Sequence, residues 1–278
     1  MRPRGCSEIS PQGPRTAGCR LLRLITWNVA GRVRRQPEQA ELLARADADV
    51  VALQEVTGRT LPLWRASFAA AGFAACECAL DDAPARTGRR LLGVLTAARE
   101  PLRRLRPPDD VPWPERVLCS VVADVEVVNL HSPIAPAPRL AKVRTHEAVA
   151  AYLEARADRP VVLCGDLNTP RRELPDGDVV TFAHDSAGRL RPERGERWDR
   201  AERALVHGLR ERGWADAFRV LHGYGEREAS WTFPQDKGGW RLDHVLVRGV
   251  RPVASAYAHD WRRAGLSDHS PLVVDLAC

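Results

Sequence analysis

The sequence PVVLCGDLN, residues 160–168, joins a short apolar run to a glycine, an aspartate and an asparagine. The run Pro160–Cys164 has the length and composition of a buried β-strand. Asp166 and Asn168 follow it in a strand–glycine–turn pattern. Because strand ends in a layered α/β fold converge on one rim, where binding sites form, we expect these two side chains at such a rim.

Polar side chains stand at the ends of other apolar runs as well. They are Asn28 after the predicted strand Leu21–Thr26, Gln54 and Glu55 after Asp49–Leu53, Asn129 and His131 at the end of a hairpin over Val117–Leu130, Asp243 within Arg241–Val247, and Asp268 and His269 before Leu272–Leu276. Convergence of these ends would place three carboxylates and one or two amides around a hard cation. Such ligation, rich in oxygen and free of sulfur, favours Mg²⁺ or Mn²⁺ over Zn²⁺. A carboxylate and a histidine beside a divalent ion are what phosphoester hydrolysis requires.

The order of predicted elements indicates an α/β fold. Strands alternate with helices such as Arg139–Ala155 and Arg200–Arg212, and no flexible linker follows residue 20. We therefore expect one layered α/β domain over residues 21–278. Residues 170–198 are polar and interrupted by glycine and proline, which predicts a long surface excursion. Residues 1–20 are rich in proline, glycine and arginine and are expected to form a disordered leader.

The composition of the 278 residues excludes several classes of protein. No run of about 18 apolar residues predicts a membrane span, and the first twenty residues lack the apolar core of a secretory signal. We expect a cytosolic monomer with no membrane partner. Seven cysteines without a C-x-x-C pair argue against a zinc ribbon and against a disulfide framework.

The formal charge of +6 leaves two interpretations open. Only two of the 42 basic residues are lysines, Lys142 and Lys237. Arginine suits phosphate geometry and stacks on bases, which favours a polyanionic partner such as nucleic acid. A solvated basic surface explains the same charge equally well.

Five motifs, in chain order and spacing, resemble the endonuclease/exonuclease/phosphatase superfamily. They are TWNVAG (26–31), LQEV (53–56), CGDLN (164–168), RLDHVLV (241–247) and SDHSPL (267–272). The segment 196–219 and ASWTF (229–233) are most similar to exonuclease III and the AP endonucleases. The resemblance covers the chain from about residue 21 onward. It implies a four-layer α/β sandwich, with two mainly antiparallel sheets face to face and helices outside.

The resemblance also implies a role for each matching residue at the metal edge. Glu55 is expected to be the principal Mg²⁺ ligand, with Asn28 beside it and Asp268 completing the metal edge. Asp166 is expected to orient or deprotonate the attacking water, and Asn168 to hold a phosphate oxygen.

A histidine pair completes the implied site. Asp243 is expected to accept a hydrogen bond from His269, which fixes the tautomer of that histidine and favours its charged form. His269 would then stabilise the pentacovalent phosphate. His244 points to the opposite face of its strand and is interpreted as structural.

One motif departs from exonuclease III. The segment NLHSP (129–133) presents His131 where those enzymes have a tyrosine, and histidine there is typical of the DNase I, sphingomyelinase and deadenylase branches. His131 would protonate the leaving oxygen or bind the phosphate as an imidazolium. Trp231 either lines a substrate pocket, by stacking, or belongs to the core.

These observations predict a Mg²⁺-dependent phosphodiester hydrolase, a DNA nuclease acting on abasic or 3′-blocked DNA. A first alternative is a phosphodiesterase or phosphatase of the same fold acting on lipid headgroups, inositol phosphates or RNA. A second is a binding module that has kept the fold and lost catalysis.

Overall fold

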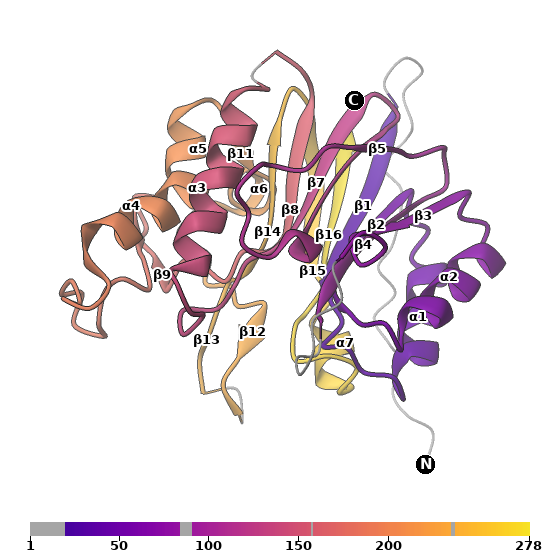
Figure 1. The fold of residues 1–278 in the computed structure, drawn as a ribbon, viewed down its shortest axis with the longest axis horizontal. Helices are drawn as coiled ribbons and strands as arrows, with labels where there is room; N and C mark the ends of the chain where they lie inside the picture. The colour runs from indigo at the N-terminus through magenta and orange to yellow at the C-terminus, as the bar shows by residue number, and fades with distance from the viewer. Residues whose placement is uncertain (1–19, 84–90, 157, 235–236) are drawn as a thin grey trace.

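Two six-stranded β-sheets lie face to face in the computed structural model, which describes residues 20–83, 91–156, 158–234 and 237–278 (Figure 1). The first sheet has the order β15-β16-β1-β2-β4-β3 and contains β1 (Leu21–Asn28), β2 (Val50–Val56), β3 (Ala75–Cys78), β4 (Gly93–Ala98), β15 (Arg251–Tyr257) and β16 (Leu272–Ala277). The second has the order β11-β14-β8-β7-β6-β5 and contains β5 (Arg103–Leu105), β6 (Val117–Val122), β7 (Val125–His131), β8 (Val161–Asp166), β11 (Ala215–Asp216) and β14 (Asp243–Arg248). Both are mainly antiparallel, with parallel pairing at β1–β2 and β7–β8.

Helices cover the outer faces of the two sheets (Figure 1). On the first sheet lie α1 (Gln36–Arg45) and α2 (Leu61–Ala70), and on the second lie α3 (Ala141–Glu154), α4 (Gly195–Val206) and α5 (Gly208–Glu211). The remaining elements are short: the 3₁₀ turn Pro114–Arg116, α6 (Ala217–His222), α7 (His259–Arg263), and the ribbons of β9 (Arg172–Glu173) with β10 (Val179–Val180) and of β12 (Trp231–Thr232) with β13 (Gly239–Trp240). The predicted layered α/β sandwich is confirmed.

Alternation along the strands divides the core into three layers. Leu22 and Leu24 of β1 pack between the sheets, whereas Ile25 and Trp27 pack against the helices α1 and α2. The second sheet has the same division between the inter-sheet core and the core under α3 to α5. Trp27 is fully buried, and its indole N–H donates to the carbonyl of His269 at 3.0 Å. The core under the helices is therefore tied directly to a predicted site residue.

The hairpin between β6 and β7 turns where the sequence predicts. Ala123 and Asp124 both have positive φ, 51° and 65°, and form a two-residue turn between Val122 and Val125. Such a turn has the twist that two antiparallel strands need.

The segment 170–198 is more structured than its composition predicts. It contains β9, β10 and the first turn of α4, and its Val179, Thr181 and Ala183 are buried. The expected surface excursion is therefore wrong in part, because buried side chains anchor the segment to α4. The helix expected over Arg200–Arg212 is also divided, since α4 ends at Val206 and α5 begins at Gly208.

The predicted disordered leader, residues 1–20, falls outside the described residues except for Arg20. Of the helices in the described ranges, none combines the length and the apolarity needed to cross a bilayer. The domain boundary at residue 21 stays a prediction.

Candidate active site

Four of the predicted site residues lie at one end of the inter-sheet core. Strand alternation explains this position, because each has the same parity as core residues on its own strand. On β8, Asp166 follows Val162 and Cys164, and on β14 Asp243 precedes Val245. Asn28 on β1 and His131 on β7 continue the same face of their strands. The apolar sandwich therefore ends in a buried polar rim.

Glu55 reaches this rim against the alternation of β2. Leu53 packs under the helices, so a regular strand would point Glu55 to that outer face as well. The pairing of β2 with β4 shifts between Leu53 and Val56, and Glu55 has φ of 61°. A β-bulge with a left-handed residue redirects a side chain in this way. The bulge therefore brings the Glu55 carboxylate to the other site residues.

The amide of Asn28 joins two of the carboxylates. Its Nδ2 donates to Glu55 Oε1 at 3.2 Å and to Asp166 Oδ2 at 3.0 Å. Its Oδ1 accepts from the backbone N–H of Ala30 at 3.0 Å, which fixes the orientation of the amide. His131 Nε2 lies 3.7 Å from both Glu55 Oε1 and Asp166 Oδ2. These four side chains form one cluster.

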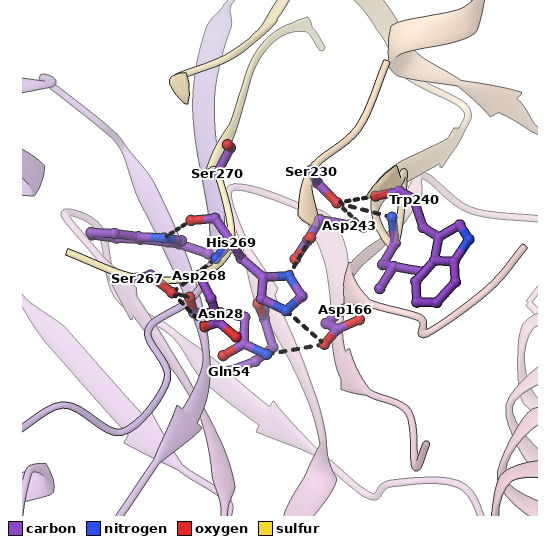
Figure 2. Close-up of polar contacts among 12 residues, drawn as sticks. Asn28, Gln54, Asp166, Ser230, Trp240, Asp243, Ser267, Asp268, His269 and Ser270 are labelled. Carbon is purple, nitrogen blue, oxygen red and sulfur yellow. Dashed lines mark hydrogen bonds and ion pairs between the residues drawn. The ribbon is translucent and has the colours of Figure 1, made fainter. Parts of the chain in front are cut away.

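His269 lies between two aspartates (Figure 2). Its Nδ1 is hydrogen bonded to Asp243 Oδ2 at 2.7 Å, and its Nε2 lies 3.9 Å from Asp166 Oδ2. Burial disfavours its charge, but the carboxylates of Asp243 and Asp166 raise the pKa of His269 to about 10. The imidazole is therefore held as a cation beside Asp243, as the resemblance implies.

Two further groups at the rim, Asp166 and His131, have pKa values shifted toward their neutral forms. Burial raises the pKa of Asp166 to about 7; His269 opposes this rise, and the charge of Asp243 adds to it. Burial lowers the pKa of His131 well below its usual value, and the charges of Arg116 and His269 lower it further. Burial therefore disfavours the imidazolium form of His131, which both predicted roles require, the proton donor and the phosphate-binding cation.

Asn168 closes the rim on the side of the second sheet. It has a left-handed backbone with φ of 51°. Its backbone N–H donates to Asp166 Oδ1 at 3.0 Å, and its Nδ2 donates to the carbonyl of Ser132 at 2.8 Å. Gly165, on the same turn, has φ of 130°, and a Cβ there would lie 2.0 Å from the carbonyl oxygen of Leu130. Only glycine fits at this position.

Asp268 and Trp231 lie at the margin of the cluster. Asp268 is exposed, and no hydrogen bond or ion pair between described residues joins it to Glu55 or Asn28. Trp231 is half-buried, its backbone forms a bridge to His269, and its ring stacks on Trp240 with centroids 5.1 Å apart. A substrate-stacking role and a core role are both compatible with Trp231, because the ring is half-buried and already stacked on Trp240.

Three residues that support the rim received no role from the sequence: Gln54, Asn129 and Ser230. Gln54 Nε2 donates to Asn129 Oδ1 at 2.8 Å across the two sheets, and both side chains are fully buried. Ser230 Oγ accepts from the backbone N–H of Asp243 at 3.1 Å. The positions of Gln54 and Asn129 in the sequence could have indicated this role. Gln54 directly precedes Glu55, and Asn129 lies two residues before His131, on the same face of the strand. His244 lies on the opposite face, fully buried, and its Nε2 is 2.8 Å from the carbonyl of Thr169.

The chemistry of the donor set fits a hard divalent cation. Glu55 and Asp166 present carboxylate oxygens to one another across the Asn28 amide, with no sulfur nearby. Asp243 Oδ1 is buried and has no hydrogen-bond partner. Asp166, Asp243 and His269 have ligand atoms within 4.8 Å of one another, but the hydrogen bond between His269 and Asp243 already explains that proximity. Glu55, which has no hydrogen-bonded histidine among the described residues, is the better candidate for an oxygen ligand to a metal.

Comparison with known proteins identifies the family of the chain. Residues 25–269 match the model of the Endonuclease/Exonuclease/phosphatase family. The chain belongs to this family. The membership that the five motifs predict is confirmed.

Individual members of the Endonuclease/Exonuclease/phosphatase family agree with this assignment. A DNA-(apurinic or apyrimidinic site) endonuclease of Dictyostelium discoideum is 33% identical over 138 residues, which cover 45% of this chain and 35% of that relative. An AP endonuclease structure from Archaeoglobus fulgidus has a TM-score of 0.67 at 22% identity, covering 91% of this chain and 98% of its own. A humanized D. rerio TDP2 has a TM-score of 0.64 at 16% identity, covering 92% and 98%. At these identities the two structures establish the fold.

Proposed function

We propose that this chain is a divalent-metal-dependent phosphodiesterase, with Mg²⁺ or Mn²⁺ as the metal, and that it acts on DNA as a nuclease. The observation that carries the proposal is the buried row Asp243–His269–Asp166 beside Glu55 and Asn28. A cation held between two carboxylates at the mouth of a sandwich suits an anionic substrate. The presence of all three groups of this row beside Glu55 argues against a binding module that has lost catalysis.

Each side chain has one task in the proposed reaction. Asp166 accepts the proton of the attacking water, and the His269 cation stabilises charge on the phosphate oxygens. Asp243 holds the ring of His269 through Nδ1. Asn168 donates to a phosphate oxygen. Glu55 would hold the metal, with Asp268 at the exposed margin, and the metal would neutralise the phosphate charge. Asn28, expected from the sequence as a ligand, points its Nδ2 at Glu55 and would instead orient that carboxylate.

The substrate assay tests the proposal directly. Labelled duplex with one abasic-site analogue, undamaged duplex and bis-p-nitrophenyl phosphate are incubated with Mg²⁺ or with EDTA. Metal-dependent incision at the lesion alone supports abasic specificity, which the similarity to the Dictyostelium enzyme and the stacked ring of Trp231 favour. Turnover of the small diester without incision moves the substrate to lipid headgroups, inositol phosphates or RNA. No turnover of any of these substrates contradicts the proposed activity.

Glu55→Ala is expected to weaken metal activation. Loss of a group that merely orients a metal ligand costs about 10- to 100-fold in metal affinity, so loss of a ligand should raise the half-activating Mg²⁺ concentration at least about 100-fold. Metal titration of the hydrolysis rate measures this change. Glu38→Ala, at an exposed carboxylate bonded to Arg35, is the control. A Glu55→Ala protein that stays active in EDTA would exclude the metal assignment.

His131→Ala is expected to lower kcat by about 100-fold. His131 is 2% exposed and held near neutrality by burial, so we expect it to act as a neutral hydrogen-bonding group toward the leaving oxygen. Steady-state kinetics with the small diester measure the effect, and His207→Ala, at the break between α4 and α5, is the control. A rate within a few-fold of wild type would remove His131 from the mechanism.

Monomeric state and cytosolic location stay predictions.

A further inference from the structure

A lysine is buried directly behind the site. Lys142 on α3 is 1% exposed. It is one of two lysines in the sequence, with Lys237, and the remaining 40 basic residues are arginines. Its Nζ lies 2.7 Å from Glu202 Oε1 on α4, whose side chain is also 1% exposed. Burial of both charges carries a desolvation cost, which close contact with one another and with further hydrogen bonds must offset. The position therefore calls for a reason beyond charge pairing.

The ammonium group makes a second, directed contact. Lys142 Nζ donates to the backbone carbonyl of Asn168 at 2.6 Å, and it lies 4.9 Å from the centroid of the Phe182 ring. A compact ammonium can point one proton at the carboxylate and another at the carbonyl, whereas the planar fork of arginine fixes the directions of its donors. A chain that otherwise uses arginine has lysine where that geometry matters.

Glu202 gathers the residues on either side of this contact. Its carboxylate accepts hydrogen bonds from Thr169 Oγ1 at 2.7 Å, from the Phe182 N–H at 2.8 Å and from Trp198 Nε1 at 2.6 Å. The ion pair thus holds Asn168 through Lys142 and Thr169 through Glu202. These are two consecutive residues of the turn that begins at Asp166.

The same helix also holds the other partner of Asn168. His146, one turn after Lys142 on α3, has Nε2 2.7 Å from Ser132 Oγ. The carbonyl of Ser132 in turn accepts from Asn168 Nδ2 at 2.8 Å. Asn168 is therefore held at its backbone carbonyl by Lys142 of α3, and at its side chain by Ser132, whose hydroxyl contacts His146 of the same helix.

We propose that Lys142, with Glu202, is the positioning residue for Asn168, and that the ion pair orients the Asn168 amide toward the substrate phosphate. This inference rests on the proposed function for its kinetic consequence. Its structural part, the conformation of Asn168, does not.

The kinetic test uses Lys142→Met with a matched control. Arg156→Met removes another cation, just after the same helix. Arg156 Nε lies 2.9 Å from Glu126 Oε1, and the Glu126 side chain, like that of Glu202, is 1% exposed. Misplacement of a binding group by about 1 Å costs on the order of 100-fold, so Lys142→Met should lower kcat by about 10- to 100-fold, with a smaller change in KM. Arg156→Met should keep kcat within about 3-fold of wild type, because it removes no contact to the rim. In an Asn168→Ala background, Lys142→Met should lower kcat no further. An equal loss in both single variants, or additive losses with Asn168→Ala, would overturn the proposal.

A spectroscopic test does not depend on activity. The chain has three asparagines, Asn28, Asn129 and Asn168, so ¹⁵N-asparagine labelling gives three side-chain amide pairs. In Lys142→Met the Asn168 pair should shift or broaden, while the Asn28 and Asn129 pairs keep their wild-type positions. An unmoved Asn168 pair, or an equal change in all three, would overturn the proposal even if the wild type hydrolyses no phosphodiester. If Lys142→Met does not fold, Glu202→Gln takes its place, and the same three signals decide.

Discussion

Asp166→Asn is expected to lower kcat about 10⁴-fold, near the upper limit for a single general base. Asparagine has the shape of aspartate but cannot accept the proton of the attacking water. The substitution keeps the size of the side chain, and its remaining oxygen can still accept from the Asn168 N–H. An amide nitrogen would replace the oxygen that accepts from Asn28 Nδ2, so we expect a lower thermal midpoint but a folded protein at assay temperature.

Hydrolysis of bis-p-nitrophenyl phosphate at saturating Mg²⁺, together with thermal unfolding, measures both expectations for Asp166→Asn. Asp109→Asn is the matched control, since that carboxylate is exposed and bonded only to Arg106 among the described residues. A kcat for Asp166→Asn within about 10-fold of wild type, well below the range for an acid–base group, would contradict the proposed role.

Arg241→Met is expected to lower the free energy of unfolding by about 3–5 kcal/mol at pH 7. Arg241 is 4% exposed, and its guanidinium bonds both Glu173 and Asp216, at 2.5 and 2.6 Å. Without it, two buried carboxylates lose a shared cation, although Glu173 keeps Arg219. Asp243 lies two residues after Arg241 and begins β14, so that strand would also lose an anchor.

The deficit of Arg241→Met should depend on pH. Burial opposes the charge of Glu173, but Arg241 and Arg219 lower the pKa of that carboxyl to about 2, and Arg241 also lowers the pKa of Asp216. A carboxyl whose pKa is lowered on folding stabilises the folded protein at pH values above its unfolded pKa, about 4.3 for glutamate. The folded protein loses this stabilisation as the pH falls toward about 2. The difference in stability between wild type and variant should therefore be largest at pH 7 and smaller at pH 3.

Urea unfolding at the two pH values measures the difference for Arg241→Met. Arg35→Met, which removes an exposed ion pair with Glu38, should change stability by less than about 1 kcal/mol. A deficit for Arg241→Met of that small size at pH 7 would show that the buried cluster contributes little.

Much of the site follows from local sequence pattern. Successive side chains of a strand point to opposite faces of the sheet. Once the apolar residues of a strand are placed between the sheets, this alternation puts Asn28, His131, Asp166 and Asp243 on the same face. The order of the five motifs then identifies the family. Periodicity is a property of neighbouring residues, so it is available before the chain folds.

The tertiary structure decided what depends on distant partners. Glu55 reaches the rim only because a bulge breaks the alternation of β2, and the pairing of β2 with β4 determines that bulge. The sequence predicted a polar surface loop around Ala183. The segment is buried in the structure because it packs against α4, which local sequence does not reveal. Lys142 and Glu202, 60 positions apart in the numbering, meet only when α3 packs against α4. The sequence by itself determined which faces of the strands are apolar and which chemical groups end them. Contacts between residues far apart in the chain decided where those groups point, because no local period encodes such a contact.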